Sequence, residues 1–123
     1  MALPVKLAFT LTFLERLMDR VSTYFDGQVS VTAIPHEMRM SHWIYAPKVE
    51  EVATQNVLLD LTGGLWDLVG ASEENETLTL YLRKYPGVSE GVSISIRKGE
   101  YLLCLNGRAY EASTLRMALE SYP

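Results

Sequence analysis

The sequence is poor in cysteine, and this scarcity limits the class of protein. Cys104 is the one cysteine among 123 residues, so no disulfide can form within the chain. A small secreted scaffold held together by internal disulfides is therefore excluded. A single free cysteine fits a reducing compartment, and we expect a cytoplasmic protein.

The chain also has no long apolar run. No window approaches the roughly 20 apolar residues that a membrane-spanning helix needs. Residues 7–14 are apolar, but no basic residue precedes Lys6 and no small-residue cleavage site follows, unlike in a signal peptide. We therefore expect no membrane partner.

Positive charge is scarce as well. Eleven Lys and Arg residues stand against 15 Asp and Glu residues, which gives a net charge of −4. This acidic balance argues against nucleic-acid binding, so we expect none. A hydrophobic content of 48% is typical of a folded protein, and 123 residues suffice for a single domain, residues 1–123.

The clearest structural signal is the alternation of apolar and polar residues in two runs, residues 77–83 and 92–97. Successive side chains of a strand point to opposite faces, so each run predicts a half-buried strand. The residues predicted to face the core are Leu78, Leu80, Leu82, Val92, Ile94 and Ile96. Residues 65–69, which lead through a polar loop into the first run, are predicted to form a further strand.

Turn residues continue this pattern into a C-terminal β-meander. Lys98 and Gly99 predict a tight turn before a strand over residues 100–105. Asn106 and Gly107 then predict a two-residue hairpin, because a type I′ turn needs positive φ at both central positions. Residues 108–111 complete the meander as a short strand.

The N-terminal part carries two incompatible patterns. Residues 5–13 alternate like a strand, which would precede a helix over residues 13–25. A continuous apolar stripe at helical spacing runs through Leu7, Leu11, Leu14, Met18, Val21 and Phe25. The stripe favours one long helix, and Asp26 and Gly27 end the element in either case.

The remaining elements complete an α+β prediction. Residues 28–34 and 36–46 are predicted strands separated by Pro35. Pro47 is predicted to open a helix, and Ser113 to cap a last helix that buries Leu115 and Leu119. The predicted fold is a mostly antiparallel sheet with helices packed on one face. This order of elements resembles the profilin-like and roadblock-type domains and the small acidic chaperones of type III secretion.

The residue pattern indicates no catalytic site, cofactor or metal. His36 and His42 on one strand would lie about 20 Å apart, too far to bind one ion. Asp60 and Asp67 flank two glycines that lack the Lys-Ser/Thr of a phosphate-binding loop. We therefore expect no catalytic residues, no metal and no cofactor, and an enzyme is the least favoured class.

Three aromatic residues are the candidates for ligand binding. Trp43, Tyr45 and Trp66 are predicted to line a pocket between the sheet and the helices, as aromatic residues often do. Core packing is the simpler role for large aromatic side chains. A small-molecule-binding domain with an aromatic-lined pocket is accordingly the alternative hypothesis.

The leading hypothesis is a small, acidic, non-enzymatic protein-binding module that acts through its apolar N-terminal element. On a helix, Phe9 and Phe13 form a second apolar ridge where a surface helix normally carries charge. Contiguous exposed apolar surface usually marks a contact site. The ridge is therefore predicted to bind a protein partner or a second copy of the chain, as in an inhibitor, an immunity-type protein, a secretion-chaperone-like protein or a homodimer.

Overall fold

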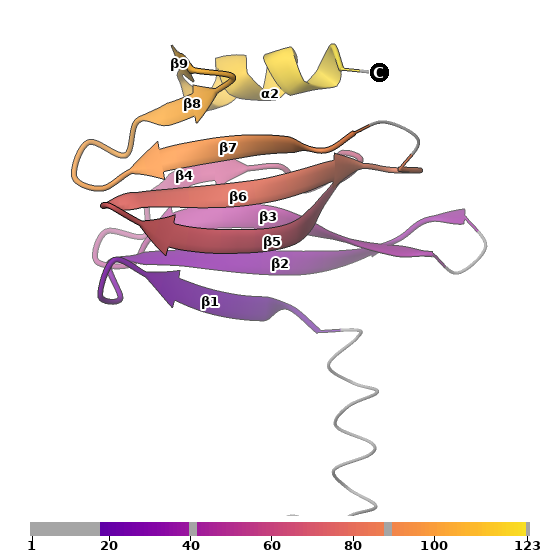
Figure 1. Ribbon diagram of the computed structural model, residues 1–123. Helices are drawn as coiled ribbons and strands as arrows, with labels where there is room; N and C mark the ends of the chain where they lie inside the picture. Colours follow the sequence, from indigo (N-terminus) through magenta and orange to yellow (C-terminus); the bar gives the residue numbers. More distant parts are fainter. Residues whose placement is uncertain (1–17, 40–41, 88–89, 123) are drawn as a thin grey trace, which may run out of the picture.

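The computed structural model describes residues 18–39, 42–87 and 90–122, and strands dominate this part of the chain (Figure 1). The elements are β1 (Arg20–Tyr24), β2 (Val29–Glu37), β3 (Trp43–Glu51), β4 (Val57–Asp60), β5 (Trp66–Glu74), β6 (Thr77–Lys84), β7 (Val92–Arg97), β8 (Leu103–Leu105), β9 (Arg108–Tyr110) and α2 (Ala112–Glu120). No helix of this described part is long and apolar enough to cross a membrane.

The strands form two antiparallel sheets in which every neighbour in space is also a neighbour in sequence. One sheet has the order β1-β2-β3-β4 and the other β5-β6-β7-β8-β9. β5 lies against β3, and both sheets contribute to a single buried cluster. The fold is thus two facing sheets built from consecutive hairpins.

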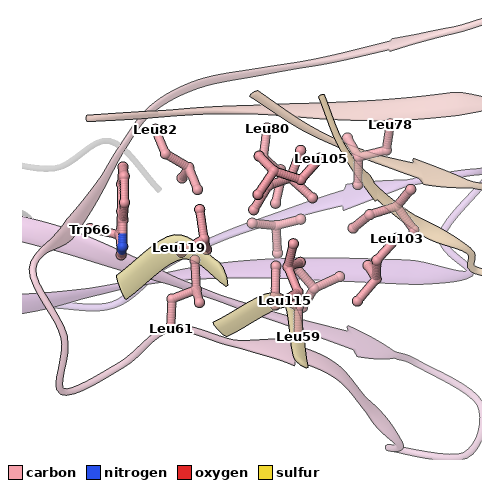
Figure 2. Close-up of a cluster of buried hydrophobic side chains, with 14 of the residues drawn as sticks. Leu59, Leu61, Trp66, Leu78, Leu80, Leu82, Leu103, Leu105, Leu115 and Leu119 are labelled. Carbon is pink, nitrogen blue, oxygen red and sulfur yellow. The ribbon is translucent and has the colours of Figure 1, made fainter. Parts of the chain in front are cut away.

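The core lies between the sheets and contains apolar side chains only among the described residues. Leu78, Leu80 and Leu82 of β6 and Ile94 and Ile96 of β7 are each at most 1% exposed. The other sheet and α2 complete this cluster (Figure 2). The members that they contribute include Val29, Val31, Val49, Leu59, Leu115 and Leu119.

The predicted meander is confirmed, including its register. Leu78 pairs with Ile96, and Leu80 pairs with Ile94. Asn106 and Gly107 have φ of 54° and 77°, and they join β8 to β9 as a two-residue hairpin. The third predicted strand begins at Leu103 instead of residue 100, because Tyr101 has a φ of 52° and the chain is still turning there.

The predicted α+β fold with helices packed on one sheet face is wrong. Among the described residues the single helix is α2, and it closes one side of the space between the two sheets, beside β4 and β8. The resemblance to profilin-like, roadblock-type and secretion-chaperone domains rested on the predicted helices and is withdrawn with them.

The helix predicted to begin at Pro47 is replaced by β3, a turn and β4. Pro47 lies inside β3, where its carbonyl accepts the Leu61 N–H at 3.0 Å. In a strand, the N–H and C=O of one residue point to the same side. The Pro47 carbonyl points towards the β4 side, so the N–H that proline lacks would point there as well. The last β3–β4 pair is Lys48 with Asp60, and Pro47 lies one residue beyond it. Because the missing N–H faces away from β2, the hydrogen bonds between β2 and β3 are kept.

The first element is also corrected where the structure describes it. Residues 20–24 form β1 instead of the end of a helix, which suits the β-branched Val21 and Thr23. Residues 1–17, with the predicted ridge, lie outside the described residues. Asp26 and Gly27 do end the element, through positive φ values of 54° and 85°.

Two smaller predictions are also wrong. Pro35 does not interrupt the chain between strands, because it lies inside β2 opposite Tyr45. α2 has Glu111 at its N-cap without a side-chain hydrogen bond, so Ser113 is not the cap. The predicted inward residues Leu115 and Leu119 are nevertheless fully buried.

Candidate functional site

The three predicted ligand-binding aromatics lie in three separate hollows. Trp43 shares one with His42 and Tyr85, and Tyr45 shares another with Arg20. Trp66 lines a third, near α2. The three aromatics thus line different hollows, and a ligand-binding role for each stays a prediction.

The hollow at Trp66, named the Trp66 pocket below, lies at the end of the core. It has a volume of about 220 Å³ and is lined by Leu61, Gly64 and Leu65 together with Trp66. Figure 2 shows Trp66 at one end of the buried cluster, near Leu61, Leu82 and Leu119. The indole is 4% exposed and packs edge-on against Tyr122, with ring centroids 6.4 Å apart. The lining is thus predominantly apolar, as in most small-molecule sites.

Two cations and one acid stand at the rim of the Trp66 pocket. Arg116 donates to the carbonyls of Asp60 at 3.1 Å and Thr62 at 2.9 Å, and its Nε lies 3.8 Å from Glu120. The Lys84 ammonium donates to the Tyr122 carbonyl at 2.5 Å and lies 5.9 Å from the Trp66 ring centroid. Arg116 therefore has an acidic neighbour, whereas no carboxylate of the described residues pairs with Lys84.

Asp60 and Asp67, which flank the turn before Trp66, serve as local hydrogen-bond acceptors. Asp60 accepts the Thr62 N–H at 2.9 Å and the Thr62 hydroxyl at 2.5 Å, while Asp67 accepts the Tyr45 N–H at 2.7 Å. Burial raises the pKa of Asp60, but the Thr62 hydrogen bonds and the charges of Lys48 and Arg116 outweigh it and lower the pKa below 3.8. Both carboxylates therefore hold nearby backbone in place.

A second hollow of about 220 Å³ opens between β1 and β5. Its most prominent feature is Arg20, whose guanidinium lies 4.3 Å from the centroid of the Tyr45 ring. The small residues Ala33 and Gly70 leave the space open beneath it. Sequence reasoning missed Arg20 as a lining residue because it assigned this segment to a helix.

The two histidines of the predicted strand lie on different strands or loops of the first sheet. His36 ends up in β2 and His42 just before β3, so the two stand on opposite arms of a hairpin and not on one strand. Nε2 of His36 is buried and has no hydrogen-bond partner among the described residues. No group of three His, Cys, Asp or Glu among the described residues is placed to hold a metal ion.

The edge strand β1 is the most exposed of the longer elements. Four of its five residues are exposed, including Val21 at 64%, and Met18 just before it is 57% exposed. The predicted contact residues Phe9 and Phe13 lie outside the described residues, so the ridge stays a prediction. Met18 and Val21 were the sequence signal for this exposed edge, but the helical prediction placed both in its buried apolar stripe.

Comparison with protein-family models, curated proteins and solved structures finds no match for this chain.

Proposed function

We propose that this protein is a non-enzymatic protein-binding module that acts through the N-terminal edge of its first sheet. The observation that carries the proposal is the exposed, regular strand β1. It pairs with β2 over five consecutive residues without a bulge, and among the described residues it has no other strand neighbour. Inhibitors and immunity-type proteins are modules of this kind.

An edge strand of this kind is a template for another strand. Among the described residues no strand pairs with its outer backbone groups, and natural edges are usually blunted with proline, bulges or lysine. β1 contains none of these, and Arg20 is its single charge. Addition of a strand to such an edge is a common mode of protein recognition.

The partner that suits this edge is a second copy of the chain. Antiparallel pairing of β1 with itself about Ser22 places Val21 opposite Thr23 and Arg20 opposite Tyr24. β-branched pairs and a cation beside an aromatic ring are favourable across strands, and no like charges meet. Five residues bury little of the roughly 1,600 Å² of a typical interface, so the apolar Met18 and the predicted ridge of Phe9 and Phe13 are expected to contribute.

The oligomeric state tests this proposal. Light scattering after size-exclusion chromatography should find a dimer, and Val21→Lys should convert it to a monomer with unchanged circular dichroism. Val57→Lys, at an exposed valine of the opposite edge strand β4, is the matched control and should stay dimeric. Phe9→Asp combined with Phe13→Asp should also give a folded monomer.

Two outcomes would contradict the proposal. If the wild-type protein stays monomeric at its highest soluble concentration, the chain does not self-associate and the proposed dimer is wrong. If the double phenylalanine variant unfolds, these residues belong to a core and not to an interface. Action in the cytoplasm is part of the proposal and is supported by the single cysteine, Cys104.

A further inference from the structure

We infer that the Trp66 pocket is a binding site for a small aromatic or alicyclic molecule that carries one carboxylate. This inference is independent of the proposed protein-binding edge, because β1 contributes no residue to the pocket. The size of the pocket, its lining and the charge at its rim each support the inference.

The size of the pocket selects a small ligand. Its volume of about 220 Å³ exceeds that of an engineered apolar cavity of about 150 Å³ that accepts benzene, but it is below that of most drug-sized sites. A single six-membered ring with a short substituent fits these limits. Leu61, Leu65 and Trp66 supply the apolar contacts for such a ring.

The charge at the rim selects the substituent. Glu120 lies beside Arg116, and each terminal nitrogen of Arg116 donates to one backbone carbonyl, that of residue 60 or that of residue 62. Lys84 keeps an ammonium that no described carboxylate pairs with, next to the Trp66 ring. A ligand carboxylate at Lys84 would make a charge-assisted hydrogen bond there.

The indole of Trp66 adds a second unused donor. Its contacts in the structure are to the Tyr122 ring and the Lys84 ammonium, and its N–H donates to no described residue. This N–H is not among the buried unpaired side-chain atoms of the described residues, so it is open to solvent. An acceptor-rich ligand in the pocket is a suitable partner for this donor as well.

Gly64 provides a way to close the pocket. It does not have the positive φ of Gly63, so a side chain causes no backbone strain. A Cβ atom would lie 3.6 Å from the Leu61 carbonyl oxygen, which is an ordinary contact. Gly64→Leu should therefore fill the pocket, and Gly64→Ala should narrow it.

The experiment measures binding of three small probes that differ in charge: phenylacetate, phenylacetamide and phenethylamine. Trp43→Phe leaves Trp66 as the one tryptophan, so its fluorescence reports on the pocket. We expect phenylacetate to bind about tenfold more tightly than the amide, since a hydrogen bond to a charged group is worth at least that factor, and the amine to bind most weakly.

Substitutions show which residues cause the preference for phenylacetate. Lys84→Met should bring phenylacetate down to the affinity of the amide, while Lys84→Arg should keep the preference. Lys98→Met, at a half-buried lysine in the turn after β7, is the matched control and should change nothing. Gly64→Leu should abolish binding of all three probes, and Gly64→Ala, the smaller change, should weaken it if the leucine variant does not fold.

Three results would overturn the inference. The first is equal binding of the acid and the amide. The second is a preference for the acid that survives Lys84→Met. The third is the absence of any response of Trp66 at millimolar probe in a protein that circular dichroism shows to be folded.

Discussion

Alternate apolar residues of β6 and β7 decide which face of the second sheet is buried. Ile94 is fully buried opposite Leu80, whereas its neighbour Ser95 is half-buried and points to the other face. A shift of one residue would exchange the two faces, so the register depends on these side chains. The same alternation leaves Tyr81 45% exposed on the outer surface.

Substitution at adjacent residues tests this division of faces. Ile94→Ala should lower the free energy of unfolding by about 2–5 kcal/mol, because it removes buried methyl and methylene groups and leaves a cavity. Ser95→Ala should be nearly neutral. Chemical denaturation of both variants measures the difference, and equal losses would contradict the observed register.

At the scale of elements, turns decided which predictions succeeded. The hairpin at Asn106 and Gly107 could be predicted because its residue types tolerate positive φ. The turn between β3 and β4 contains no glycine, and Gln55 adopts a φ of 61° there. Without a turn signal, the apolar residues of this segment fitted a helical face as well as two short strands.

The candidate sites show the same limit of sequence reasoning. Trp66 was a predicted ligand residue, but its neighbours Leu61, Lys84 and Arg116 come from a loop, the end of β6 and the helix. Such a constellation depends on the packing of the two sheets and α2. That packing could not be predicted while residues 20–25 and the segment that begins at Pro47 were assigned to helices.

The hairpin itself offers a test of an element. Gly107 has a φ of 77°, and nothing lies within 4 Å of a Cβ built on it. Gly107→Val should therefore destabilise the protein by about 1–3 kcal/mol through backbone strain alone. Gly107→Asn is the control, since asparagine tolerates this region and should cost much less. Equal losses in denaturation experiments would show that the turn is not of type I′.

At the scale of the whole molecule, the two sides of the sandwich are closed differently. α2 inserts Leu115 and Leu119 between the sheets on the side of β4 and β8, and Figure 1 places it far from β1. Between β1 and β5 the space is lined partly by polar groups such as Arg20 and Tyr45. The Trp66 pocket therefore lies beside the side that α2 closes, while the proposed contact edge β1 borders the partly polar hollow on the other side.

Asp60 joins these parts, because it ends β4, holds Thr62 in the following turn and presents its carbonyl to Arg116 of α2. Its pKa is lowered in the folded protein, so the unfolded chain takes up a proton at a higher pH than the folded one. The ionised carboxylate thus stabilises the fold above the unfolded pKa, and this contribution is lost as the pH falls through the folded pKa.

Asp60→Asn should accordingly be less stable than the wild type at neutral pH, and the difference should shrink as the pH falls to 3.8 and below. Thermal unfolding from pH 7 to the acid range measures this difference. Glu100→Gln removes an exposed carboxylate far from Asp60 in the sequence and should follow the wild type throughout. If the stability difference between Asp60→Asn and the wild type is the same at every pH, the carboxylate contributes through its shape and not through its charge.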